Sequence, residues 1–293
     1  MAAIDNLLAG AVDLHCHSGP SPMPRRITHA EAARQAEEAG FRAILAKCHY
    51  HDTVTDIIAM APLLDGLNVQ VFGGIALNSQ NGGLNPFAVD RSLKMGGKMI
   101  WFPTISSRAH LDHAAHNAAT QNHFQPRGMM QSQEVSVFDD GGDVKPVVHE
   151  IIGQAKEAGA CVSTGHLGYD AARAVVEAAA KAGHTQVVLS HPNFLVGIER
   201  QQAAELAALG ATIEHDLAMY MEGRHFTIPE LLEWIDLIGP ERTSFGSDLG
   251  QVGNPLPVEG YREVVGKLAD SGVSEKAIRL MVRDNPSRLI GLD

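Results

Sequence analysis

Short apolar runs alternate with longer amphipathic segments from one end of the chain to the other. This alternation is typical of repeated βα units around a parallel sheet, because buried parallel strands are continuously apolar and their crossover helices are apolar on one face. The apolar runs predict eight strands, at residues 11–15, 43–47, 69–75, 99–102, 160–164, 186–190, 211–214 and 243–247. The amphipathic segments predict eight helices, at residues 28–39, 53–64, 86–95, 144–158, 170–182, 200–209, 229–238 and 258–271.

Local start and stop signals support these helices. Thr28 and Glu31 have the spacing of a capping box, and Pro229 lies in a first turn. Glycines follow predicted helix ends at Gly40, Gly159, Gly183 and Gly210. Eight strands with eight helices predict an α/β protein whose single domain, residues 1–293, is a (β/α)8 TIM barrel.

A doubly wound open sheet is the main alternative fold. Such a sheet usually has fewer βα units and carries a glycine-rich phosphate-binding turn after its first strand. Here residues 15–20 read HCHSGP, which is not that turn. The barrel is therefore favoured.

One connection is too long for a simple loop. Residues 105–143 separate the fourth strand from its helix, and we expect a hairpin at 133–138 that turns at 139–142. An insertion after a barrel strand lies at the catalytic mouth, so we interpret it as a lid or substrate wall. The insertion contains four histidines: His110, His113, His116 and His123. The first three are spaced three residues apart, and we interpret them as the solvent-exposed face of a helix.

Composition excludes several classes of protein. The chain is 45% apolar with a net charge of −11 and shows no basic stripe, so a disordered chain and a nucleic-acid-binding protein are not expected. No run approaches 18 apolar residues, and the N-terminus lacks the features of a signal peptide. The three cysteines Cys16, Cys48 and Cys161 form no CxxC pair, which favours a cytoplasmic protein without disulfides. The 15 histidines remain to be explained.

Several histidines and one aspartate occur at predicted strand ends. His15 and His17 are two residues apart after the first strand, so they share a face with Asp13. The fifth, sixth and eighth strands end at His166, His191 and Asp248. Catalytic groups of barrel enzymes gather at these carboxyl ends, and paired imidazoles bind divalent metal ions.

This set resembles the amidohydrolase superfamily of metal-dependent hydrolases, whose members carry HxH after the first barrel strand, single histidines after the fifth and sixth, and an aspartate after the eighth. The resemblance covers nearly the whole chain. It implies that His15 and His17 hold a buried metal ion, that His166 and His191 hold a second ion or orient substrate, and that Asp248 is both ligand and base. It implies one or two divalent ions, zinc first, with manganese, iron or nickel as alternatives.

The fourth strand departs from that pattern. Two-metal members usually have a carboxylated lysine or a glutamate there, but residues 100–104 read IWFPT, and Lys98 would lie at the wrong end of the barrel. The second strand offers Lys47 instead. Lys47 is then either a carboxylated lysine that bridges two ions or a free ammonium that binds a substrate oxyanion. Three further residues are candidate ligands or supporting groups: His49, His51 and Glu214.

Other polar or aromatic residues near strand ends are candidates for substrate binding. Arg25 and Arg26 could bind a carboxylate, Asn78 lies in an amide-rich loop after the third strand, and Trp101 could form an aromatic wall. The expected partner is a small molecule, with no nucleic acid and no membrane, and a homo-oligomer stays open.

The sequence leaves four functions in competition. The leading hypothesis is a hydrolase that uses a metal-activated water on a lactone, cyclic amide or N-acyl bond, because a divalent cation lowers the pKa of bound water to about 7. A mononuclear decarboxylase and a phosphoesterase are alternatives on the same barrel. A metal-binding protein without turnover is the non-enzymatic alternative, and the intact Asp248 argues against it.

Overall fold

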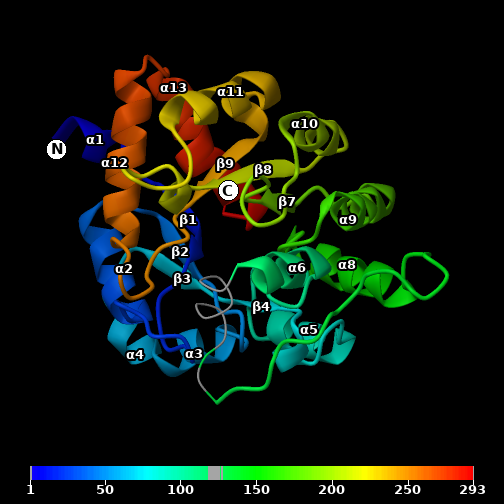
Figure 1. Ribbon diagram of the computed structural model, residues 1–293. Coiled ribbons are helices and arrows are strands. Elements are labelled where there is room, and N and C mark those ends of the chain that lie inside the picture. The colour runs from blue at the N-terminus through cyan, green and yellow to red at the C-terminus, as the bar shows by residue number, and fades with distance from the viewer. Residues whose placement is uncertain (1, 118–125, 127, 293) are drawn as a thin grey trace.

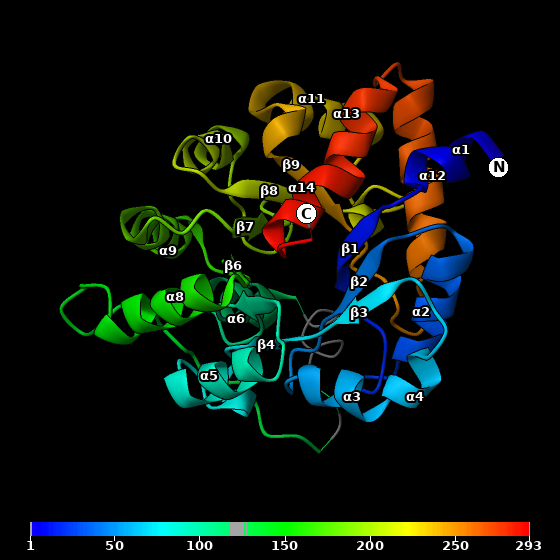
Figure 2. The same cartoon turned by 180° about the vertical axis from the view of Figure 1, so that it is seen from behind.

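The computed structural model describes residues 2–117, 126 and 128–292. It has a central ring of parallel strands with helices around the outside (Figures 1 and 2). The strands are β1 (Val12–Cys16), β2 (Ala43–Ala46), β3 (Gln70–Phe72), β4 (Gly74–Ala76), β5 (Met99–Trp101), β6 (Cys161–Ser163), β7 (Val187–Ser190), β8 (Thr212–Asp216) and β9 (Thr243–Gly246).

The α-helices cover the strands in chain order. They are α1 (Ala2–Leu8), α2 (His29–Glu38), α3 (Val54–Ala59), α4 (Ala61–Leu64), α5 (Pro86–Lys94), α6 (Arg108–His116), α8 (Pro146–Ala158), α9 (Tyr169–Ala182), α10 (Arg200–Ala208), α11 (Ile228–Ile238), α12 (Pro257–Asp270), α13 (Glu275–Arg279) and α14 (Asn285–Leu289). Within the described ranges, no helix is both long and apolar enough to cross a bilayer.

The strands close into a barrel through backbone hydrogen bonds. They pair in the order β1-β2-β3 and β4-β5-β6-β7-β8-β9, and every pair is parallel. The Asp248 N–H donates to the His15 carbonyl at 2.9 Å, and the His17 N–H donates to the Leu249 carbonyl at 2.8 Å, which joins the last strand to the first. The predicted (β/α)8 barrel is confirmed.

The third barrel strand differs from its prediction because it is broken into β3 and β4 at Gly73. The start of α3 passes so close that a Cβ at Gly73 would lie 2.6 Å from the Val54 amide nitrogen. The predicted helix at 53–64 is likewise divided into α3 and α4, and Pro62 lies in the first turn of α4. Among the described residues, four helices lie outside the eight predicted ones, namely α1 before β1, α6 in the insertion after β5, and α13 and α14 after α12.

The barrel interior is packed rather than hollow. Leu14, Leu45 and Trp101 belong to one buried apolar cluster, and Leu289 and Ile290 from the C-terminal segment belong to the same cluster. Two larger apolar clusters lie between strands and helices. This packing leaves polar side chains to the carboxyl ends of the strands, where the candidate site lies.

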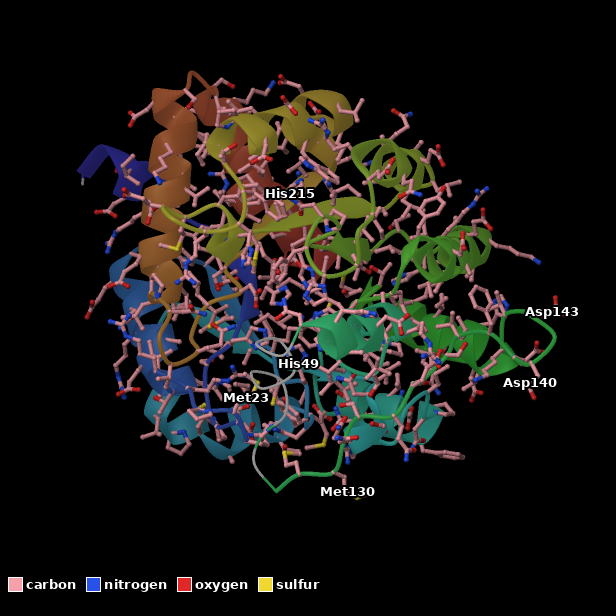
Figure 3. All side chains as sticks on the ribbon, viewed as in Figure 1. Met23, His49, Met130, Asp140, Asp143 and His215 are labelled. Atoms are coloured by element: carbon pink, nitrogen blue, oxygen red, sulfur yellow. The ribbon has the colours of Figure 1, made fainter. Side chains whose placement is uncertain are left out.

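The insertion after β5 contains α6 and an extended segment. The predicted hairpin is much shorter than expected: it is reduced to one antiparallel bridge between Phe138 and Val144, and residues 133–137 form no strand. The predicted turn is present, held by the Asp143 N–H donating to Asp139 Oδ1 at 3.0 Å. Asp140 and Asp143 lie at the outer edge of the molecule (Figure 3), so this turn is no wall of the mouth. His123 lies outside the described residues.

Candidate metal and catalytic site

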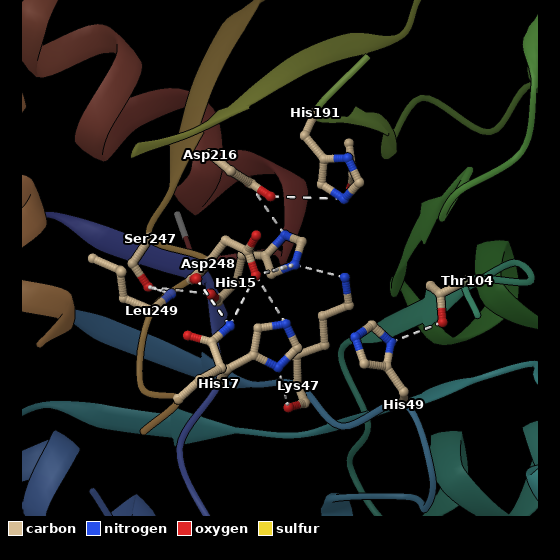
Figure 4. Close-up of polar contacts among 12 residues, drawn as sticks. His15, His17, Lys47, His49, Thr104, His191, Asp216, Ser247, Asp248 and Leu249 are labelled. Carbon is tan, nitrogen blue, oxygen red and sulfur yellow. Dashed lines mark hydrogen bonds and ion pairs between the residues drawn. The ribbon is translucent and has the colours of Figure 1, made fainter. Parts of the chain in front are cut away.

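The carboxyl ends of β1, β2, β7, β8 and β9 bring polar side chains together at the barrel mouth (Figure 4). His15 and His17 lie on one face of the chain at the end of β1, because side chains two residues apart on a strand point the same way. Both imidazoles are almost completely buried. Buried imidazoles this close to carboxylates are the environment in which proteins hold divalent cations.

We call His15, His17 and Asp248 the outer group. Asp248 Oδ1 lies 3.0 Å from His17 Nε2 and 3.7 Å from His15 Nε2. One ligand atom of each residue lies within 4.8 Å of the others. His17 Nδ1 lies 3.2 Å from the Lys47 carbonyl oxygen, and a proton donated there leaves Nε2 as a lone-pair donor facing Asp248.

We call His15, His191 and Asp216 the inner group, and their ligand atoms also lie within 4.8 Å of one another. Asp216 Oδ1 is 3.3 Å from His15 Nδ1, and Oδ2 is 3.7 Å from His191 Nε2. Asp216 is fully buried, and neither carboxylate oxygen has a hydrogen-bond partner among the described residues. Burial, followed by the charges of Glu214 and Asp248, raises the pKa of Asp216 well above its usual range. These donors fit a divalent cation, which would compensate the buried negative charge.

The backbone is strained at both groups. Among the described residues, positive φ angles outside glycine occur at His191 (29°), Leu195 (65°) and Asp248 (49°). Such conformations cost roughly 1–3 kcal/mol each and persist where the surrounding structure imposes them. Two of these three residues, His191 and Asp248, are the ones that the sequence predicted as metal ligands at strand ends.

Lys47 follows β2 and lies between the two groups. Its Nζ is 2.6 Å from His15 Nε2 and 5.6 Å from the centre of the Trp101 ring. The side chain is fully buried, and desolvation lowers the pKa of its ammonium, although Asp248, Asp216 and Glu214 oppose that shift. The Trp101 ring is 1% exposed and packs inside the barrel beneath Lys47, so it does not face open solvent.

Glu214 supports His15 from inside the barrel. Its Oε2 lies 3.1 Å from His15 Nδ1 and accepts a hydrogen bond from the Ser190 hydroxyl at 2.8 Å. A carboxylate behind an imidazole fixes the ring and raises its basicity at the opposite nitrogen. Glu214 is therefore placed to orient His15.

The other candidates after β2 occupy different places. His49 lies at the mouth (Figure 3), with its ring 5.1 Å from that of His17 and its Nδ1 2.9 Å from the Thr104 hydroxyl. His51 turns away, and its Nε2 is 2.6 Å from Asp56 Oδ2. The structure thus brings His49 to the other imidazoles and leaves His51 in a separate ion pair.

The candidate substrate-binding residues also separate. Arg25 Nη2 lies 3.4 Å from His17 Nδ1, whereas Arg26 is exposed and donates to the Asn254 carbonyl at 2.9 Å. Asn78 is fully buried, and its side-chain oxygen accepts from the Thr104 N–H at 2.8 Å while its amide donates to the His49 carbonyl at 2.9 Å. The Asn78 amide is thus used to hold two mouth loops together.

Two residues of the site were missed from the sequence, Asp216 and His110. The prediction that His110 lies on a solvated helix face is wrong, since it is buried and its Nδ1 lies 3.0 Å from His166 Nδ1. Its ring stacks on that of His166 at 5.1 Å between centroids. Ser107 joins the two segments, accepting from the His110 N–H and donating to the His166 carbonyl at 2.6 Å. Ser107 has the residue type of a helix N-cap and precedes His110 by three residues. This spacing was the signal in the sequence that could have placed His110 in the first turn of a helix beside the mouth.

A cavity of about 730 Å³ opens above Asp248. Phe194 and Met219 supply apolar surface, and Arg224, Gln251 and Asn254 supply polar groups. This size suits a small molecule. Another cavity, of about 820 Å³, is lined by residues of α10 and α11, Arg200 and Trp234 among them, and includes neither metal-binding group.

Comparisons with known proteins identify a family and a fold. A model described as "Family of unknown function (DUF6282)" matches residues 10–214. No curated protein matches the chain. Among solved structures, an amidohydrolase from Pseudomonas aeruginosa has a TM-score of 0.67 at 12% identity, covering 99% of this chain and 97% of that one.

Two further structures share the architecture. An organophosphorus hydrolase from Deinococcus radiodurans has a TM-score of 0.57 at 14% identity, with 96% of this chain and 92% of that chain covered. A metallopeptidase, dipeptidase AC of family M19, has a TM-score of 0.62 at 11% identity, with 97% and 98% covered. The similarity shows that this chain shares a barrel fold with these proteins, as the sequence predicted.

Proposed function

Since the chain belongs to the family of unknown function DUF6282, we propose its activity from its own site: a metal-dependent hydrolase acting on a small lactone, cyclic amide or N-acyl compound. The observation that carries this proposal is the outer group, in which ligand atoms of His15, His17 and Asp248 lie within 4.8 Å of one another and Asp248 lines the mouth cavity. The names of the similar structures, an amidohydrolase, an organophosphorus hydrolase and a metallopeptidase, agree with hydrolysis.

The outer group would hold a divalent cation, most simply zinc, with His166 and His191 on the adjoining strands for a second ion or for substrate. Such a cation, when bound, activates water and polarises a carbonyl oxygen. His17 donates its Nδ1 proton to the Lys47 carbonyl, and Glu214 holds the Nδ1 side of His15. Both histidines are thereby oriented before a ligand arrives.

Asp248 is the proposed proton carrier. It is 15% exposed, lines the mouth cavity, and is steadied by Gln251 Nε2, which donates to its carbonyl at 3.1 Å. A carboxylate in this place takes a proton from the attacking water and passes it to the departing oxygen or nitrogen. Lys47 would act either as a carboxylated bridge or as an ammonium beside the substrate oxyanion, and intact-protein mass with and without bicarbonate separates the two forms.

A panel assay tests the proposal. Zinc-loaded protein is expected to hydrolyse members of a panel of lactones, cyclic amides and N-acyl compounds, to lose this activity on chelation, and to regain it when zinc is added. Activity that persists in fully stripped protein would refute the metal-dependent mechanism.

Decarboxylation is the second candidate, and one observation favours it. The end of β5 is apolar, because Trp101 lies in the core and Phe102 is fully buried, so β5 supplies no metal ligand. Since two-metal members usually have a ligand on this strand, its absence favours a site with one metal ion. Carbon dioxide release from carboxylate substrates, without hydrolysis of the panel, would select this activity. Phosphoester substrates belong in the same panel, since one similar structure is an organophosphorus hydrolase.

Arg25 is predicted to bind a substrate carboxylate. It lies beside His17, makes no ion pair with a carboxylate among the described residues, and has a buried Nε without a hydrogen-bond partner. Arg25→Met should raise KM for a carboxylate-bearing substrate by about 10- to 100-fold, since a hydrogen bond to a charged group contributes about 1.5–3 kcal/mol. Steady-state kinetics measure this. Arg26→Met is the control, and equal effects of both variants would remove the assignment.

His110 is predicted to orient His166. Loss of a group that orients a metal ligand typically lowers metal affinity by about 10- to 100-fold. We therefore expect His110→Phe, which keeps a stacked ring but no Nδ1, to weaken zinc binding measured by competition with a chelating dye. His116→Phe, on the exposed end of α6, is the control. Unchanged zinc affinity in His110→Phe would mean that His110 only packs against His166.

A further inference from the structure

His49 lies among the candidate metal-binding histidines at the mouth, but its hydrogen bonds differ from theirs. We propose that His49 donates a hydrogen bond to the substrate oxygen that becomes negative during hydrolysis, and that Thr104 and Asn78 hold the ring in the form that can donate. The inference rests on the proposed function, because it concerns a carbonyl group attacked by water. His49 is thereby assigned to the substrate rather than to a metal ion.

Two backbone groups fix the orientation of the Asn78 amide. Its Oδ1 accepts from the Thr104 N–H at 2.8 Å and from the Ser106 N–H at 3.1 Å. Nδ2 is therefore the opposite end of the amide, and it donates to the His49 carbonyl oxygen at 2.9 Å and to Thr104 Oγ1 at 2.6 Å. The Thr104 hydroxyl oxygen thus already accepts one hydrogen bond.

The Thr104 hydroxyl has a single proton to donate. Within the part of the chain that the structure describes, its only acceptor is His49 Nδ1, at 2.9 Å. Since Nδ1 accepts with its lone pair, the proton of the neutral ring is on Nε2. A doubly protonated ring would carry a proton on Nε2 as well. Nε2 is therefore a donor in both charge states, and the assignment does not depend on titration of the ring.

The histidines of the metal-binding groups are supported in the opposite way. His17 Nδ1 lies 3.2 Å from the Lys47 carbonyl oxygen, and His191 Nδ1 lies 3.4 Å from the Phe194 carbonyl oxygen. A carbonyl oxygen can only accept, so it keeps the ring proton on Nδ1 and leaves Nε2 with a lone pair for a metal ion. A donating hydroxyl does the reverse. Neither the outer nor the inner group includes His49.

The ring of His49 lies next to the outer group. Its centre is 5.1 Å from that of His17 and 5.6 Å from that of His166. Figure 4 shows one ring nitrogen facing Thr104 and the other on the side of Lys47. The side chain is only 2% exposed. An N–H that is fixed in place and shielded from water stabilises a developing negative charge more strongly than it would in bulk solvent.

The proposed step leaves the proton on His49. When water adds to the carbonyl carbon, a C–O bond forms, the π electron pair moves to the carbonyl oxygen, and Asp248 takes a proton from the water. The resulting oxyanion accepts a hydrogen bond from His49 Nε2. On collapse the electron pair re-forms the C=O bond, the bond to the leaving oxygen or nitrogen breaks, and that atom takes the proton from Asp248. His49 therefore stabilises the intermediate without acting as an acid.

Nuclear magnetic resonance tests the assigned ring form without reference to activity. Zinc-loaded protein carrying ¹⁵N-labelled histidine is compared with His49→Phe, whose missing signals identify the His49 ring. We expect a proton on Nε2 and none on Nδ1. Thr104→Val should shift part of the rings to the other form, because the donated proton is lost, whereas Thr104→Ser should retain the wild-type form.

Kinetics and metal analysis test the catalytic role. His49→Phe should lower kcat on the best panel substrate by about 10²- to 10³-fold, the usual effect of removing one oxyanion donor, with a smaller change in KM and unchanged zinc content. Thr104→Val should lower kcat by about 3- to 10-fold, the effect of one lost hydrogen bond, and Thr104→Ser should restore it. His184→Phe, at a buried histidine after α9, is the matched control and should keep wild-type kinetics.

The outcomes separate this inference from the proposed function. A proton on Nδ1 of His49, loss of zinc in His49→Phe, or a wild-type kcat in that variant overturns the donor role and leaves the hydrolase proposal standing. No turnover of the panel by the wild type overturns both. Circular dichroism verifies that each variant folds, and Thr104→Val with its Thr104→Ser rescue keeps the test decisive if His49→Phe does not fold.

Discussion

Asp248→Asn is expected to lower kcat by about 10²- to 10⁴-fold, the usual contribution of a positioned general acid or base. The amide has the size of the carboxylate and keeps an oxygen toward His17 Nε2, which lies 3.0 Å from Asp248 Oδ1. It cannot accept and return a proton at neutral pH. Metal content should therefore stay close to that of wild type while turnover on the best panel substrate stops.

The control for Asp248→Asn is the same change at Asp270, an exposed residue at the end of α12. That variant should keep wild-type kinetics. Steady-state assays and metal analysis on the same samples distinguish a lost base from a lost ion. Full activity in Asp248→Asn would refute the proposed mechanism. Loss of the metal together with loss of activity would show that Asp248 acts only as a metal ligand.

The strands were predictable because burial inside a parallel barrel imposes continuous apolar runs. Each predicted strand overlaps an observed one, and the histidines expected at strand ends follow β1, β6 and β7. The break at Gly73 was not predictable, since it depends on how closely the start of α3 approaches. Hydrophobic pattern specifies which residues are buried, and it carries no information on the spacing of two backbones.

The missed site residues have different causes. Asp216 lies just past the predicted end of the seventh strand at 214, and only the longer β8 places it on the inward face with Glu214. His110 was assigned to solvent by a spacing of three along α6, but the barrel mouth covers one end of that helix and buries the first histidine alone. Periodicity gives the face of a helix and cannot give what covers it.

Asn78 illustrates the reverse case, in which a polar loop residue suggested ligand binding. Its amide is used by the Thr104 and Ser106 N–H groups and by the His49 carbonyl. A buried amide in a loop is as useful for satisfying backbone groups as for binding substrate. Sequence alone does not distinguish these uses, because both place a polar residue after a strand.

Gly246→Ala is expected to destabilise the protein by about 1–3 kcal/mol and to abolish metal binding, since overpacking a close-packed interior forces backbone and side chains apart. Gly246 ends β9 against the site. A Cβ there would lie 2.5 Å from the His15 Cβ and 2.9 Å from Glu214 Oε1. The His15 Cβ cannot move aside as the tip of a flexible side chain could, because it is attached directly to the backbone of β1. A lower Tm together with loss of bound zinc would be the result.

Gly153→Ala provides the matched control for that variant. Gly153 lies inside α8, its φ is not positive, and an added Cβ there would meet no atom within 4 Å. Alanine in a helix interior is favoured over glycine by about 0.5–1 kcal/mol, so this variant should raise Tm slightly and keep all bound metal. If Gly246→Ala behaved like Gly153→Ala, then β9 would not approach His15 as closely as the metal site requires. The close approach of the last strand to the first is thus tested by a single methyl group.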